Sequence, residues 1–205
     1  MENNLMQDIK LMHQALTDAD DSVLIVIDVQ QSFLDKMPKE QVQPLINRIT
    51  WVLQVAVKLN IPLIATAEDI PEEGTNISQI ANFFPKGTKE HNKMSHGLAG
   101  DPVILSAVEK TKRKTAVIVG LETDVCVMQS AIGLLQKGFR VVVLSDATAS
   151  PGPCHEAGII RMQNAGVIIS TVKGTCYEWT RTVDLLKEKF YAEMWENEPP
   201  EGVYL

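Results

Sequence analysis

The feature that most constrains the fold is an alternation of short apolar runs, rich in Val and Ile, with stretches of helical periodicity. The apolar runs lie at residues 22–28, 61–67, 115–120, 140–145 and 167–171. The helix-periodic stretches lie at residues 5–16, 41–60, 101–111, 124–137, 155–165 and 175–189. Short runs that are apolar throughout are typical of strands buried on both faces of a parallel sheet. The pattern therefore predicts an α/β fold, an open parallel β-sheet covered by helices on both faces as a three-layer sandwich.

Length and composition support this fold and exclude some partners. The chain has 205 residues, 45% of them hydrophobic and 22% charged, which is enough apolar material for one large core, so we expect a single domain over residues 1–205. A net charge of −7 argues against nucleic acid as the main partner. No apolar run approaches the roughly 20 residues that a membrane span needs.

Compartment and chain ends are predicted from the same sequence. The 3 cysteines do not suggest a disulfide framework, and the amino terminus does not read as a signal peptide, so we expect a cytoplasmic protein. Residues 68–90 read mostly as loop, with a helical turn near residues 78–84. The last residues, NEPPEGVYL, form either an ordered arm or a loose end.

Ligands of such a sheet gather at the carboxyl ends of the strands, where Cys126 is the first residue to consider. We expect Asp124 to cap the helix that follows strand 115–120, which puts Cys126 in its first turn. The free N–H groups and the helix dipole there favour an anion, so we expect a lowered thiol pKa and a nucleophilic role. The alternative is a buried core cysteine.

Asp28 and Lys93 each allow two interpretations. Asp28 ends an apolar strand, where it either performs acid–base or metal chemistry or caps the following turn. Lys93 lies in the stretch KEHNKMSHG and is either a solvated surface charge or a cation placed between a carboxylate and a thiol.

Several common sites are disfavoured. The four histidines, His13, His91, His96 and His155, show no paired-ligand spacing, and the cysteines are too scattered for a zinc site. No Gly-rich phosphate-binding motif and no GxSxG turn follows a strand. We therefore predict no metal and no cofactor.

The stretches LIVIDVQQSFL and VIVGLETDVCVMQSAIGLLQKGFRVVVLSDATAS, with Lys93 between them, resemble the isochorismatase-like cysteine hydrolase superfamily, as does HEAGIIRMQNAGVIIST. The resemblance covers roughly residues 23–179. It implies a catalytic triad of Asp28, Lys93 and Cys126, a cis peptide bond between Leu121 and Glu122, and an oxyanion hole formed by the N–H groups of Glu122 and Cys126.

The implied chemistry is hydrolysis of a small amide or other C–N substrate through a thioester. Two alternatives remain, namely vinyl-ether hydrolysis of the isochorismatase type and a non-catalytic binding or scaffold protein. The loop after the second strand holds Asp69 but no histidine, which disfavours the metal-dependent nicotinamidases of the superfamily.

The resemblance also implies a homo-oligomer, a dimer, tetramer or larger, in which the opening helix or the carboxyl-terminal tail packs on a neighbour. The substrate pocket is expected to include Gln30, Phe33 and Met94, although core packing is the simpler interpretation of the two apolar residues. Cys154 and Cys176 are expected to be incidental.

Overall fold

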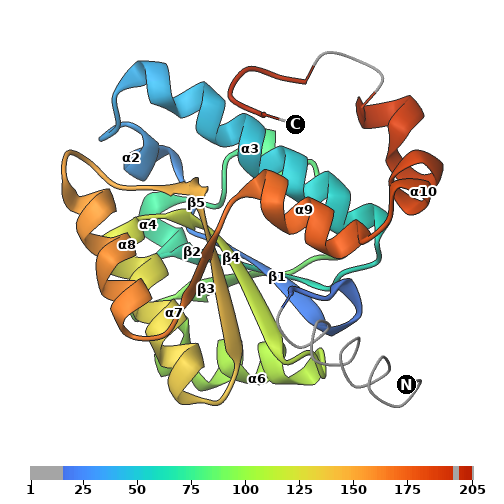
Figure 1. The fold of residues 1–205 in the computed structure, drawn as a ribbon. Coiled ribbons are helices and arrows are strands. Elements are labelled where there is room, and N and C mark those ends of the chain that lie inside the picture. The colour runs from blue at the N-terminus through green and yellow to red at the C-terminus, as the bar shows by residue number, and fades with distance from the viewer. Residues whose placement is uncertain (1–15, 196–198, 205) are drawn as a thin grey trace.

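The computed structural model describes residues 16–195 and 199–204 of the chain (Figure 1). Its centre is a six-stranded, wholly parallel sheet with the strand order β3-β2-β1-β4-β5-β6. The strands are β1 (Ser22–Ile27), β2 (Leu63–Glu68), β3 (Glu90–Lys93), β4 (Thr115–Leu121), β5 (Arg140–Ala149) and β6 (Ile168–Ser170). The predicted fold class is confirmed.

Helices connect the strands in chain order. The α-helices are α2 (Gln31–Leu34), α3 (Lys39–Lys58), α4 (Ile70–Glu73), α5 (Ser78–Ala81), α6 (Pro102–Lys110), α7 (Met128–Gln136), α8 (Cys154–Asn164), α9 (Val172–Thr180) and α10 (Val183–Leu186). Shorter or wider turns are η1 (Ala19–Asp21), η2 (Leu98–Gly100), η3 (Thr123–Val127) and η4 (Lys187–Trp195), the last two of π type. In the described part of the chain, no helix combines the length and apolar character needed to cross a membrane.

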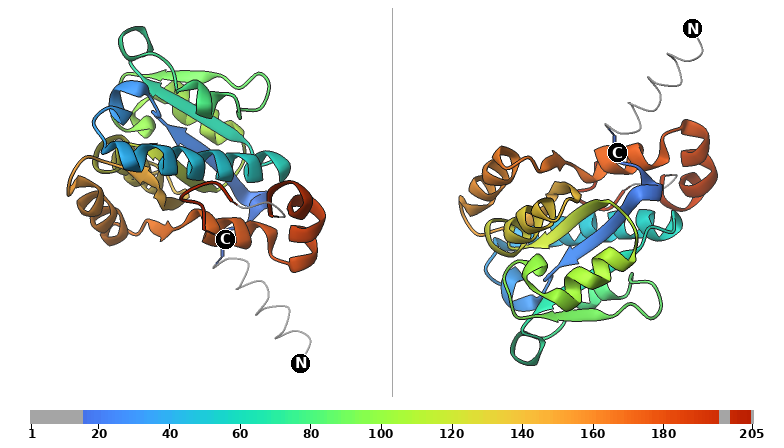
Figure 2. Two further views of the ribbon diagram at one scale, coloured as in Figure 1. Left: turned by 90° about the horizontal axis from the view of Figure 1, so that it is seen from above. Right: turned by 90° about the horizontal axis from the view of Figure 1, so that it is seen from below.

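The two faces of the sheet are covered by different helices (Figure 2). Side chains alternate along each strand, so Leu24 and Val26 of β1 pack with α3 and α9, whereas Val23, Ile25 and Ile27 pack with α6, α7 and α8. Every residue of β1 and β4 is buried, as expected for central strands of a three-layer sandwich. Each such aliphatic side chain contributes about 1.5–3 kcal/mol when it leaves water.

Most predicted elements recur in the described residues, but β3 and the short helices α2 and α4 were not predicted, and two expected helices are divided. Strand β3 was not predicted, because its sequence, EHNK, is polar. It lies at the edge of the sheet and pairs only with β2. The expected helix at residues 175–189 begins earlier, at Val172, and is interrupted at Arg181, where φ is +59°. Residues 124–137 form a π turn followed by α7 instead of one helix.

The carboxyl-terminal arm folds back on α3. Val203 is buried in the core on that face, and the carbonyl of Gly202 accepts a hydrogen bond from Arg48. Of the two interpretations, the ordered arm holds for residues 199–204. The predicted opening helix at residues 5–16 lies almost entirely outside the described residues.

Candidate active site

The order of the strands places the site at the carboxyl ends of β1 and β4, which are neighbours although β2 and β3 come between them in sequence. Asp28 follows β1 directly and is fully buried. Its N–H donates to the carbonyl of Thr66 on β2, and its Oδ1 accepts a 2.7 Å hydrogen bond from the Thr66 hydroxyl. Its φ of +50° is a conformation that Asp tolerates better than most residues. Two bonds to β2 thus fix the direction of the Asp28 carboxylate.

Gly120 lets the end of β4 approach β1 closely. Its φ is +123°, and a Cβ at this position would lie 2.0 Å from the carbonyl oxygen of Ile27. Glycine alone fits both conditions. The next peptide bond, Leu121–Glu122, is cis, as the resemblance implies.

Cys126 lies in η3, the π turn that opens toward α7, and is 2% exposed. The prediction that it occupies a first helical turn is confirmed, whereas the predicted cap is wrong. Glu122 is the N-cap residue, and Asp124 lies inside the turn, where its carboxylate accepts a 2.6 Å hydrogen bond from Ser150. The wider π turn moves the start of the helix two residues upstream.

Lys93 is the last residue of β3 and is fully buried. Its ammonium lies 3.0 Å from Asp28 Oδ2, 3.1 Å from Glu68 Oε2 and 3.6 Å from Cys126 Sγ, and it donates to the Ser95 carbonyl at 2.9 Å. Lys93 therefore lies between a carboxylate and the thiol, as the second of its two interpretations predicted. The surface-charge interpretation is wrong, because β3 turns the lysine into the protein.

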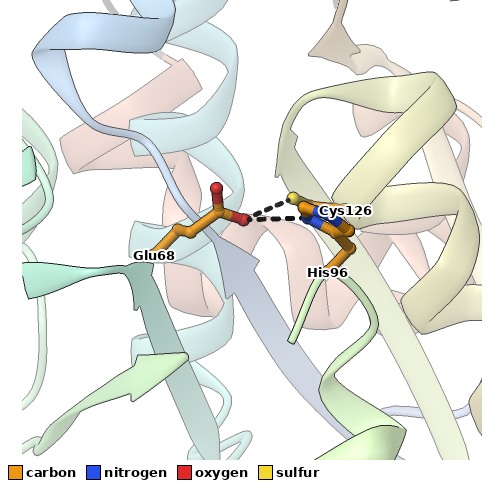
Figure 3. Close-up of side chains that lie close together, drawn as sticks. All are labelled: Glu68, His96 and Cys126. Carbon is orange, nitrogen blue, oxygen red and sulfur yellow. Dashed lines mark hydrogen bonds and ion pairs between the residues drawn. The ribbon is translucent and has the colours of Figure 1, made fainter. Parts of the chain in front are cut away.

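Glu68 is a fourth member of the cluster and its third charged group, and the sequence predicted no role for it. It ends β2, pairs with Lys93 across the β2–β3 register, and its Oε2 accepts a 3.2 Å hydrogen bond from the Cys126 thiol. The same oxygen lies 3.5 Å from Nδ1 of the exposed His96 (Figure 3). Its position after an apolar strand was the available signal, but Glu68 is followed by other acidic residues that face solvent.

The pKa values in the cluster move in opposite directions. Burial raises the pKa of Asp28 by more than Lys93 and Thr66 lower it. For Glu68, burial acts in the same upward direction but is outweighed by hydrogen bonds from Cys126 and Lys93, so its pKa is lowered. For Lys93, burial opposes the ammonium, but Asp28 and Cys126 prevail and raise its pKa. These directions favour a charged Lys93 ammonium and an ionised Glu68. Asp28 is the more basic of the two carboxylates.

The predicted lowering of the Cys126 pKa is wrong for this resting structure. Burial and the nearby Asp28 carboxylate raise the thiol pKa, and Lys93 compensates only in part. The start of the helix favours a thiolate, but two carboxylates, Asp28 and Glu68, face the sulfur and oppose it. The single Lys93 ammonium does not balance both charges, so the thiol pKa rises. Burial and the two carboxylates therefore favour the protonated thiol.

Gln30, Phe33 and Met94, the expected pocket residues, take three different positions. Gln30 is fully buried, and its amide binds the backbone N–H and carbonyl of Glu68 and the carbonyl of Gly74. Phe33 belongs to the core on the α3 face, and Met94 is 68% exposed. Gln30 thus fixes a neighbour of the sulfur, and none of the three is shown to line a pocket.

Glu68, His96 and Cys126 could together offer ligands to a metal ion, since their ligand atoms all lie within 4.8 Å of one another. A cation there would have to share the Glu68 oxygen and the Cys126 sulfur with the Lys93 ammonium. Electrostatic repulsion opposes that arrangement, so the residues fit a resident metal poorly.

Comparison with known proteins places this chain in a family. Residues 22–174 match the model of the Isochorismatase domain. "Isochorismatase family protein 2A" of Dictyostelium discoideum is 26% identical over 168 residues, which cover 77% of this chain and 81% of that protein.

Among solved structures, the MAR1 ribonuclease of Caenorhabditis elegans has a TM-score of 0.80 at 23% identity, covering 93% of this chain and 98% of that one. The YcaC gene product of Escherichia coli, described as an octameric hydrolase of unknown specificity, has a TM-score of 0.75 at 21% identity, covering 86% and 92% of the two chains. Nicotinamidase PncA of Bacillus subtilis has a TM-score of 0.63 at 16% identity, covering 73% and 99%. These structures share the fold, and the family match over most of the sequence shows that the chain belongs to the isochorismatase family.

Proposed function

We propose that this protein hydrolyses a small amide or related C–N substrate, with Cys126 as nucleophile, Asp28 as proton acceptor and Lys93 as the cation that holds both. The observation that carries the proposal is the meeting of these three side chains, from the ends of β1 and β3 and from η3, in a buried cluster. Lys93 lies 3.0 Å from Asp28 and 3.6 Å from the sulfur. A cysteine that serves only to pack the core needs no charged neighbours. The charged groups around Cys126 therefore favour a catalytic role.

The first half of the reaction forms a thioester. Asp28 takes the proton of the Cys126 thiol as the sulfur attacks the carbonyl carbon, and the raised pKa of Asp28 suits it to this transfer. Lys93 stabilises the thiolate while it forms. The oxyanion is bound by the N–H groups of Glu122 and Cys126, and when it collapses the C–N bond breaks and Asp28 returns the proton to the leaving nitrogen.

The second half restores the enzyme. Asp28 takes a proton from water, whose oxygen attacks the thioester carbon. The C–S bond then breaks, the carboxylic acid departs, and the sulfur recovers the proton from Asp28. The thiol proton leaves with the amine and a proton from water replaces it, so Asp28 and Cys126 both return to their starting states.

The family and its relatives support hydrolysis, and one fold neighbour is a nicotinamidase, an enzyme that acts on an amide. Vinyl-ether hydrolysis is the second enzymatic candidate, since it is the reaction for which the family is named. A ribonuclease role, as for the MAR1 neighbour, is disfavoured here by the net charge of −7 and by the acidic pair of Asp28 and Glu68.

A panel of small amides tests the proposal. Purified protein is assayed for release of ammonia or amine, with Cys126→Ala as control, and for release of pyruvate from isochorismate. Amine release that Cys126→Ala abolishes supports the proposal, and a covalent acyl adduct on the peptide that contains Cys126 adds to it. Pyruvate release alone would favour the vinyl-ether reaction, and no turnover at all would favour a binding or scaffold protein.

We also propose that the protein forms a homo-oligomer in the cytoplasm. The octameric YcaC neighbour supports assembly, and so do exposed apolar side chains such as Val103, Ile160 and Val183. The exposed, unpaired thiol of Cys154 suits a reducing compartment. Light scattering after gel filtration measures the mass, and a monomeric mass would contradict the assembly.

A further inference from the structure

We propose that Glu68 couples activation of Cys126 to the arrival of a substrate nitrogen. Before a substrate binds, the Glu68 carboxylate accepts a hydrogen bond from the Cys126 thiol. An N–H of the substrate then replaces the S–H on the same oxygen and frees the sulfur to react. This inference rests on the proposed function, because an amide-type substrate brings an N–H beside the carbonyl that the sulfur attacks.

The argument begins with crowding at a single oxygen. Glu68 Oε2 lies 3.2 Å from Cys126 Sγ and 3.5 Å from His96 Nδ1 (Figure 3). The same oxygen lies 3.1 Å from Lys93 Nζ. A thiol is the weakest hydrogen-bond donor among these groups, and an amide N–H is a stronger one. An arriving amide therefore displaces the S–H first, while the Lys93 ammonium keeps its place.

The oxygen is held still while this exchange takes place. The backbone N–H of Glu68 donates to Gln30 Oε1, and the Gln30 amide donates back to the Glu68 carbonyl, both at 2.8 Å. Gln30 is fully buried, and Glu68 also sits in register with Lys93. The carboxylate is thus attached to a fixed stretch of backbone beside the sulfur.

Exposure separates the roles of the two carboxylates. The Asp28 side chain is fully buried, whereas the Glu68 side chain is 25% exposed and so lies on the side of the sulfur that a substrate can reach. The charged and titratable groups facing the thiol are Asp28 from β1, Glu68 from β2, Lys93 from β3 and, across Glu68, His96 from the following loop. The lowered pKa of Glu68 suits a permanent acceptor, and the raised pKa of Asp28 suits the group that takes the proton.

The same carboxylate sets the charge that the site accepts next to the attacked carbon. Lys93 already forms ion pairs with both Asp28 and Glu68. A substrate carboxylate near the thiol would therefore be repelled by these two carboxylates, because no further cation of the cluster compensates their charge. A neutral or cationic amide nitrogen avoids this repulsion and gains a charge-assisted hydrogen bond. The inferred substrate class is an amide with at least one N–H and no anionic group adjacent to the scissile carbonyl.

The variant Glu68→Gln tests the coupling because its two expected effects have opposite signs. Without the carboxylate, modification of Cys126 by methyl methanethiosulfonate, a reagent that has no N–H, becomes faster, and the midpoint of its pH profile falls by about one unit or more. Hydrolysis of a primary amide becomes slower, with kcat/KM falling about tenfold to a hundredfold. The corresponding methyl ester, which brings no N–H, loses much less.

Glu109→Gln is the matched control, since it removes an exposed carboxylate near the end of α6. We expect it to leave both measurements at the wild-type values. Peptide mass analysis restricts the labelling data to Cys126, because Cys154 is also free.

An unchanged or slower modification of Cys126 in Glu68→Gln would overturn the inference, and so would an equal loss on amide and ester. A failure of the proposed function is distinguishable from these outcomes. In that case the wild-type protein hydrolyses no amide, while the pH profile of labelling still decides whether Glu68 holds the thiol.

Discussion

The two halves of the sheet contribute different things to the site. The half formed by β1, β2 and β3 supplies every charged side chain of the cluster, namely Asp28, Glu68 and Lys93, whereas β4 and η3 supply the sulfur and the backbone turn around it. The two halves meet where Gly120 lies against Ile27. The comparison teaches that the electrostatic environment of the nucleophile is built by a part of the chain distant in sequence, so the two can be altered separately.

The largest expected effect comes from removing one reacting group from each half. Cys126→Ala and Asp28→Asn should each lower kcat by a factor of about a thousand or more, because the two groups act as one unit. The far-ultraviolet circular dichroism of both variants should match the wild type. If Cys126→Ala kept most of its turnover on the true substrate, nucleophilic catalysis by the β4 half would be refuted.

Removing the cation of the charged half should affect stability as well as activity. Lys93→Ala leaves Asp28 buried without its ammonium, which should cost about 3–5 kcal/mol of unfolding free energy. It should also raise the pKa of the Cys126 thiol further, because Lys93 lowers it. Urea unfolding measures the first effect, with Lys36→Ala as control. Lys36 forms a partly exposed ion pair with Glu122, worth less than about 1 kcal/mol.

The seam between the halves is tested by Gly120→Ala. A methyl group there collides with the Ile27 carbonyl, so we expect the variant to lose more than about 2 kcal/mol of stability and most activity. Gly138→Ala is a matched control with φ of +87° and open space around the added carbon, and should lose only about 1–2 kcal/mol. Equal losses in the two variants would show that backbone conformation alone, and not the contact of the halves, requires glycine.

The pH dependence of kcat/KM and of thiol labelling should reflect the raised pKa values of Asp28 and Cys126. Because burial raises the pKa of Asp28, the carboxylate loses its charge at a higher pH than usual as the solution is acidified. The acid limb of kcat/KM should therefore lie above pH 3.8. Because the Cys126 pKa is also raised, iodoacetamide labelling of the free enzyme should still increase beyond pH 9.0. A labelling plateau below pH 8 would contradict the resting thiol.

The smallest expected effect is that of a chelator. Lys93 competes with a cation for Glu68 and Cys126, so treatment with EDTA should leave kcat/KM unchanged. The assay is repeated after adding Zn²⁺ to the chelated enzyme. Activity that disappears with EDTA and returns with the metal would contradict metal-independent hydrolysis.

The sequence was most informative where one pattern fixed both structure and position. Apolar runs predicted the central strands, and the stretch around Cys126 predicted its place in a first helical turn. The cis bond before it was implied by the family resemblance. Strand β3 was missed because EHNK carries no apolar signal, and its pairing with β2 depends on tertiary contacts. The contact of Glu68 with the thiol and the raised thiol pKa depend on which charges converge from distant strands, which local sequence does not record.

The two hydrogen bonds between the Gln30 amide and the main chain of Glu68 have a practical consequence for altering this protein. Both ends of the Gln30 amide bind the main chain of Glu68, so these two hydrogen bonds do not use the side chain at position 68. A designer could therefore replace that single side chain by a neutral one and screen substrates that bring no N–H, while these backbone hydrogen bonds remain.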